Sequence, residues 1–279
     1  MKKLNLHILS VFLCFCVSCA FAKVDPQQQE QKLRSFITHV SKQFEVQRLS
    51  KADQIIEYAK SNQIEKVELI RIAGALASEA ADRVNNAKAP KKHTTEIMQC
   101  NSVFSLLAKL DDPSVLELLE KTSTHTNEII RTDASIAFVR IAGVEAIPFI
   151  EMKRKDARFD EFNTVKLFDA FSAYLTKENK DQTKAIKALD YLLTTLEKEQ
   201  NGEIASHLDK VLNLHLVGYD TSIQRFRIME RLAKHENAHY RKLFQTIVIE
   251  IKKQPIEKRK DLRAAGEKLD MAIKKCAKE

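Results

Sequence analysis

Apolar residues recur at helical spacing along nearly the whole chain, and this periodicity constrains the fold more than any other feature. One apolar stripe runs from residue 130 to 141, and others occupy 186–196, 204–212 and 240–251. The β-branched residues keep the same helical register instead of alternating as they would in a strand. Five Gly and five Pro in 279 residues are too few for the frequent turns of an all-β protein. The sequence therefore predicts an all-α fold of about a dozen helices.

Residues that begin and end helices lie between these stripes. Asp111 and Asp112 precede Pro113, which suits a turn followed by the first turn of a helix. Gly143 follows a stripe and is expected to be a helix C-cap. The stretch 162–175 is apolar on most sides, so we expect its helix to be buried between neighbours.

The first 22 residues have the pattern of a secretory signal peptide. Lys2 and Lys3 precede an apolar run from Ile8 to Cys19, and Ala20-Phe21-Ala22 supplies a cleavage site after Ala22. The run is shorter than the roughly 20 residues that a transmembrane helix needs. We expect a periplasmic or secreted protein, and lipid attachment at Cys19 is the alternative.

An internal repeat is visible in the middle of the chain. When residues 107–120 are laid on 138–151, apolar positions coincide, Lys109 falls on Arg140 and Glu120 falls on Glu151. A period of this length built from helix pairs is typical of an α-solenoid.

The same region resembles HEAT repeats, over about residues 103–151. Residues Ile129 to Gly143 resemble the second helix of a repeat, and Val144 to Ile150 resemble the first helix of the next one. Arg131 and Pro148 stand where that family often has its structural Arg and Pro. The resemblance implies a right-handed α-solenoid of antiparallel helix pairs, of the HEAT or armadillo type. It implies a binding surface and no reaction.

These patterns divide the chain into four parts. Residues 1–22 are the expected signal peptide, 23–93 an N-terminal helical cap, 94–254 the HEAT-like repeats and 255–279 a charged C-terminal capping helix. Stacking is needed because a helix pair with two apolar faces buries neither of them alone.

One motif points to catalysis. His235-Glu236-Asn237-Ala238-His239 is an HExxH sequence, which on a helix would give two zinc ligands, His235 and His239, with Glu236 as the base. On a continuous helix, however, both imidazoles would lie roughly 110–150° from the apolar stripe and would face solvent. In a second interpretation, Glu236 and Asn237 form a turn and Asn237 caps a helix that begins near Ala238.

Other candidate residues give weaker signals. Cys100 and Cys276 could form a disulfide in an oxidising compartment, or Cys100 could be a buried helix residue. His215 lies near an apolar face, which is typical of a core histidine. Basic clusters at 88–92, 153–158 and 252–263 are expected to be solvated loops and helix ends. Their alternative role is contact with an anionic envelope polymer or lipid surface, since removal of Lys2 and Lys3 would leave a net charge of +6 out of +8.

From the sequence alone we expect an exported, non-catalytic scaffold or adaptor that binds a protein partner, with no cofactor and no nucleic acid. The alternatives are a zinc-dependent hydrolase and a binder of anionic envelope polymer.

Overall fold

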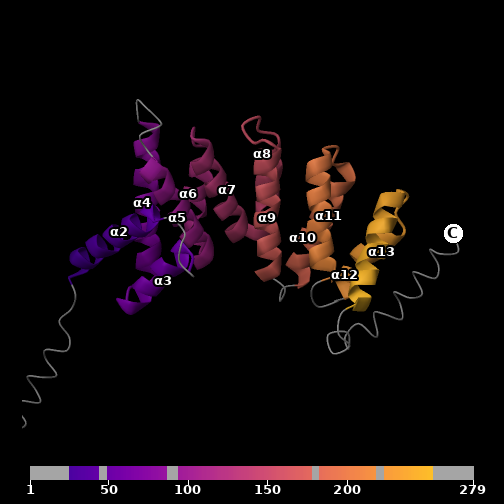
Figure 1. The fold of residues 1–279 in the computed structure, drawn as a ribbon, viewed down its shortest axis with the longest axis horizontal. Coiled ribbons are helices and arrows are strands. Elements are labelled where there is room, and N and C mark those ends of the chain that lie inside the picture. Colours follow the sequence, from indigo (N-terminus) through magenta and orange to yellow (C-terminus); the bar gives the residue numbers. More distant parts are fainter. Residues whose placement is uncertain (1–24, 44–48, 87–93, 178–181, 218–222, 254–279) are drawn as a thin grey trace, which may run out of the picture.

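Every regular element that the structure describes is helical. The computed structural model describes residues 25–43, 49–86, 94–177, 182–217 and 223–253, and these ranges contain no strand (Figure 1). The all-α prediction is therefore confirmed. The α-helices are α2 (Pro26–Lys42), α3 (Lys51–Ser61), α4 (Lys66–Asn85), α5 (Thr94–Leu110), α6 (Leu116–Thr122), α7 (Glu128–Ala142), α8 (Ile147–Arg154), α9 (Glu161–Lys177), α10 (Gln182–Lys198), α11 (Gly202–Val217), α12 (Ile223–Ala233) and α13 (Ala238–Lys253). Two short 3₁₀ helices, η2 (Pro113–Val115) and η3 (Gly143–Ala146), precede α6 and α8.

From α4 onwards the helices form pairs that follow one another along the molecule (Figure 1). Each even-numbered helix packs on the odd-numbered helix after it, and α5, α7, α9, α11 and α13 pack on one another in that order. We call these five odd-numbered helices the second row, and α4, α6, α8, α10 and α12 the first row. At the N-terminal end, α2 and α3 pack against α5.

Short polar side chains fix where the helices of the second row begin. The Asn127 side chain accepts a hydrogen bond from the N–H of residue 130 (3.2 Å), and Asp160 accepts one from that of residue 163 (2.8 Å). Asn201 does the same for residue 204, at 3.1 Å. Each cap satisfies a backbone donor that the first helical turn leaves free, which is worth about 1 kcal/mol. The three caps therefore set equivalent starting points for α7, α9 and α11.

Gly143 ends α7 as the sequence predicts. Its φ of +58° lies in the region that L side chains rarely adopt, and a Cβ there would stand 2.2 Å from Cε2 of Tyr174. Upstream, Asp112 accepts a hydrogen bond from the N–H of Ser114 (3.1 Å), and Pro113 opens η2. Both turn predictions are confirmed, with a 3₁₀ turn in place of the expected α-helical one at Pro113.

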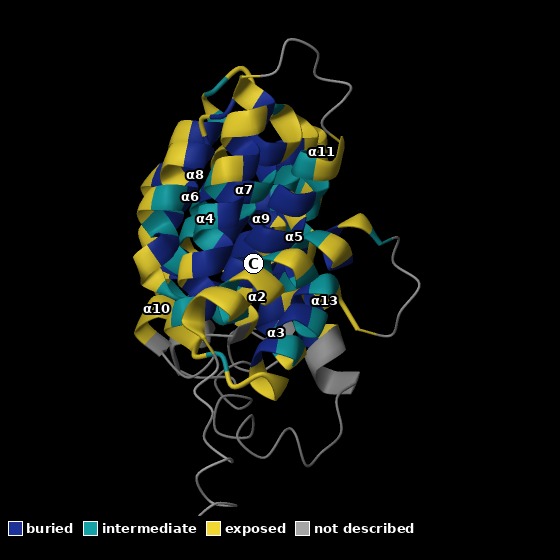
Figure 2. Cartoon of the chain, turned by 90° about the vertical axis from the view of Figure 1, so that its left-hand side faces the viewer, coloured by how far each residue is buried: buried dark blue, intermediate teal, exposed yellow. Residues whose placement is uncertain are grey.

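Two apolar clusters fill the space between the rows, and both include α7. Ile130, Ala134 and Ala137 belong to the N-terminal cluster, whereas Val139 belongs to the C-terminal cluster. The side chain of Phe138 packs against both clusters. Figure 2 shows the buried faces turned inward and the exposed faces outward. Within each cluster the apolar stripes form a core that continues from one helix pair to the next, and the two clusters meet at α7.

The helix over 162–175 is buried between neighbours, as expected. It corresponds to α9, which packs between α7 and α11, and both Phe168 and Phe171 are completely buried. Phe162 is the exception, because 65% of its surface is exposed. None of the helices in the described ranges combines the length and hydropathy needed to span a bilayer.

Candidate functional site

The HExxH residues lie in a connection between two helices. Helix α12 ends at Ala233 and α13 begins at Ala238, so His235 and His239 do not share one helix. The His235 Nδ1 accepts a hydrogen bond from the N–H of Asn237 (3.0 Å), and its ring lies 4.2 Å from that of Tyr240. This is the turn of the second interpretation, and the i, i+4 helical geometry needed for two zinc ligands is not formed here.

The other described groups of the motif are not arranged as metal ligands. The His235 Nε2 lies 3.4 Å from Oε1 of Glu197, and Glu236 is exposed. The side chain of His239 lies outside the described residues. Among those that are described, no three His, Cys, Asp or Glu side chains converge as metal ligands would.

The same turn occurs earlier in the chain, between α6 and α7. There the His125 Nδ1 accepts a hydrogen bond from the N–H of Asn127 at 2.9 Å. The Arg131 Nη1 donates to the carbonyls of His125 (2.9 Å) and Thr126 (3.1 Å).

At the later turn Arg241 donates in the same way to the carbonyls of His235 (2.7 Å) and Glu236 (2.6 Å). Both turns therefore use the pattern His-x-Asn-x-x-x-Arg, in which the His and Arg side chains satisfy backbone groups freed by the helix break.

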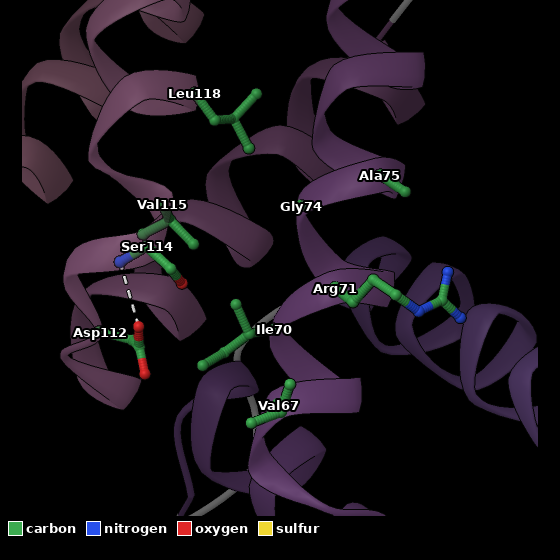
Figure 3. A pocket seen from close by; sticks show the side chains of 9 residues that line it. All are labelled: Val67, Ile70, Arg71, Gly74, Ala75, Asp112, Ser114, Val115 and Leu118. Carbon is green, nitrogen blue, oxygen red and sulfur yellow. Dashed lines mark hydrogen bonds between the residues drawn. The ribbon is translucent and has the colours of Figure 1, made fainter.

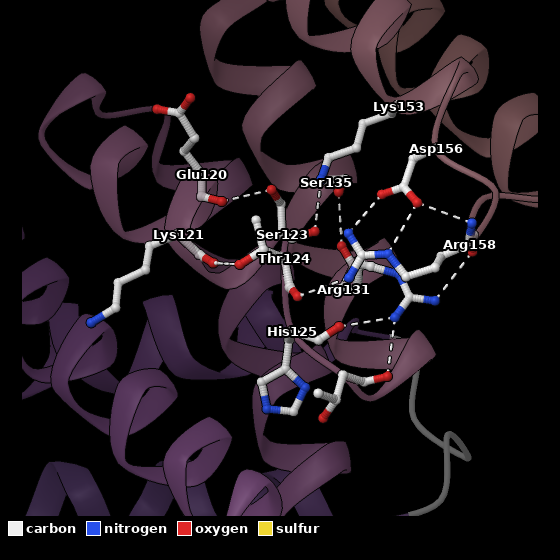
Figure 4. Close-up of polar contacts among 11 residues, drawn as sticks. Glu120, Lys121, Ser123, Thr124, His125, Arg131, Ser135, Lys153, Asp156 and Arg158 are labelled. Carbon is white, nitrogen blue, oxygen red and sulfur yellow. Dashed lines mark hydrogen bonds and ion pairs between the residues drawn. The ribbon is translucent and has the colours of Figure 1, made fainter.

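Around the first turn, Arg131 and Lys153 are buried and hydrogen-bonded to backbone carbonyls (Figure 4). The Lys153 Nζ donates to the Ser123 carbonyl at 2.7 Å and lies over the rings of Phe149 and Phe159. Burial lowers the pKa of this lysine. Since its partner carbonyl belongs to the C-cap of α6, Lys153 satisfies one of the acceptors that a helix end leaves free.

The basic cluster at 153–158 lies at the end of α8 with Lys155 and Arg158 exposed, as expected, but Lys153 is buried and Arg154 is partly buried. Lys153 is 2% exposed, and Arg154 forms ion pairs with Glu151 (2.7 Å) and Glu199 (2.6 Å). Arg158 is paired with Asp156 at 2.8 Å. The other two clusters, 88–92 and 252–263, lie almost entirely outside the described residues.

Two further candidates are parts of the core. His215 is 5% exposed and its Nε2 lies 2.7 Å from the Ser172 hydroxyl, between α9 and α11. The Cys100 thiol is free and fully buried, and burial raises its pKa to about 12. Cys276 lies outside the described residues, so the structure does not test the disulfide.

An open groove separates α4 from η2 and α6 (Figure 3). Its volume is about 460 Å³ and its lining is mostly apolar. The Arg71 guanidinium at one edge is bonded to Glu30 and Glu68, and Asp112 at the other is bonded to Ser114. The lining residues are Val67, Ile70, Arg71, Gly74, Ala75, Asp112, Ser114, Val115 and Leu118. The groove could accept apolar groups, but it brings no reactive side chains together.

A different surface is formed where the second-row helices face outward. Positions two, six, nine and thirteen residues after each cap lie on one side of a helix, within about 60° of one another. We call this surface, on α7, α9 and α11, the outer face. Its residues are Ile129, Asp133, Ile136 and Arg140 on α7, Phe162, Lys166, Asp169 and Ala173 on α9, and Glu203, His207, Lys210 and Leu214 on α11.

Large apolar side chains are exposed on the outer face. Ile129 and Phe162 stand at the same position on neighbouring helices and are 52% and 65% exposed. Leu214, near the other end of α11, is 58% exposed. Sequence reasoning missed Phe162 because it lies within an apolar run. The cap at Asp160 was the available signal, since it places Phe162 on the outward side of α9.

The two aspartates of the outer face have close partners, whereas Glu203 and the cations form no ion pair among the described residues. Asp133 accepts a hydrogen bond from Asn101 at 2.8 Å, and burial raises its pKa. Asp169 lies 3.0 Å from Nε2 of His207. Within the described ranges, neither Arg140 nor Lys210 has an ion-pair partner.

Lys166 also forms no ion pair among the described residues. Its Nζ lies 4.2 Å from the centre of the Phe162 ring, and its charge acts on Asp133 only through space. In the described part of the chain, the outer face therefore presents apolar side chains beside unpaired charges of both signs, those of the cations and of Glu203.

Comparison with known proteins gives no relative. No family model, no curated protein and no solved structure matches the chain. The interpretation of the outer face therefore depends on its own geometry.

Proposed function

We propose that the chain is an exported, non-catalytic α-solenoid of HEAT-like type that binds a protein partner along its outer face. The packing order supports the solenoid. Each helix pair contacts the pairs before and after it, and two apolar clusters that meet at α7 each extend across successive pairs. In this proposal the pairs are antiparallel and the superhelix is right-handed.

The HEAT-like character rests on the turn between α6 and α7. Arg131, at the family's structural Arg position, is 5% exposed and donates hydrogen bonds to turn carbonyls. An arginine with this role stabilises the backbone, and it is not available for binding or catalysis.

The observation that carries the function is the exposure of large apolar side chains on one face of successive second-row helices: Ile129, Phe162 and Leu214 are 52%, 65% and 58% exposed. Exposed apolar and aromatic anchors surrounded by polar groups are typical of protein-binding surfaces.

Neither alternative function gains a specific observation. The zinc hypothesis required a continuous helix, and His235 instead holds a turn. The polymer hypothesis rested partly on residues 153–158, whose Lys153 is buried and whose arginines are ion-paired.

Site-specific photo-cross-linking in the native cells would test the proposed function. A photoreactive residue placed at Phe162 or Leu214 should give discrete protein adducts, because both positions are exposed on the outer face. Lys60 and Glu117 are matched control positions, since both are exposed but lie on α3 and α6. Equal adducts at all four positions, or none at any, would refute binding through this face.

Export is tested separately by the mass of the cell-envelope form. A chain that begins at Lys23 would support cleavage after Ala22, whereas a lipid-modified chain that begins at Cys19 would support the anchored alternative. A full-length chain retained in the cytoplasm would contradict export.

A further inference from the structure

We draw no further inference here: the strongest candidate, the surface patch of exposed apolar side chains on the outer face of α7, α9 and α11, carries none, because the charges around it are of both signs and nothing in the structure shows what covers it.

Discussion

His125 and His235 occupy equivalent positions in two copies of one helix-to-helix turn. In both copies Nδ1 accepts a hydrogen bond from the backbone N–H two residues later, at 2.9 and 3.0 Å. A sequence that matches a metallopeptidase motif is thus accounted for by the hydrogen-bonding needs of a turn, and the copy at His125 has no HExxH pattern at all.

Replacing these histidines should weaken the fold and leave the metal content unchanged. His235→Ala removes one hydrogen bond to the turn, which should lower the free energy of unfolding by about 1 kcal/mol. His125→Ala should cost more, because His125 is 6% exposed and its Nε2 also lies 3.1 Å from the Ala81 carbonyl. Urea denaturation and elemental analysis give the two readouts. One zinc per purified chain, lost in His235→Ala, would revive the hydrolase alternative.

Arg131 should matter more for stability than Arg241, although both make the same turn contacts. Arg131→Met leaves the carbonyls of His125, Thr126 and Arg158 without their buried donor, which should cost about 2 kcal/mol. Arg241 is exposed, so water replaces its guanidinium and Arg241→Met should cost less than about 1 kcal/mol. Denaturation midpoints of the two variants measure this difference, and equal losses would contradict the role assigned to burial.

Gly143 and Gly202 form a matched pair for testing backbone strain. Gly143→Ala forces a side chain onto a φ of +58° and against the Tyr174 ring, so we expect a loss of at least about 2 kcal/mol. At Gly202 nothing lies within 4 Å of an added Cβ, and the residue begins α11. Gly202→Ala should therefore be neutral or slightly stabilising. Thermal unfolding of both variants decides the point, and a harmless Gly143→Ala would show that the α7–η3 junction can rearrange.

Asp156 should contribute a pH-dependent part of the stability. Its hydrogen bonds with Arg158 lower the pKa of this carboxyl to about 2. Because the folded-state pKa is depressed, the contribution is fully present above the usual aspartate value of about 4 and disappears as the pH falls towards 2. The difference in denaturation midpoint between the native protein and Asp156→Asn should therefore shrink over that interval. A difference that is constant with pH would contradict this assignment.

Local features of the fold were predictable from the sequence because single residues determine them. Gly143 ends α7 because the positive φ at this position favours glycine. Helix α13 begins at Ala238, directly after Asn237, because the free N–H groups of a first helical turn favour a capping residue such as Asn. The burial of α9 followed from the width of its apolar surface.

Longer-range features were not predictable, because they depend on which helices become neighbours. Lys153 was expected in a solvated cluster, yet the Ser123 carbonyl and two phenylalanine rings enclose it. Phe162 was expected to be buried with the rest of its apolar run, but its place two residues after the Asp160 cap turns it outward. Periodicity defines a stripe, and only the packed neighbours decide which residues at the margin of a stripe are covered.

The sharing of α7 between the two apolar clusters has a consequence for cooperativity. Chain segments on either side of α7 have separate cores, and Phe138 touches both. The two halves therefore unfold together only if disruption of one cluster displaces α7 and so also disrupts the packing of the other cluster. Weakening its contacts would do more than lower the stability of a single unit, because it would turn one cooperative protein into two independent ones.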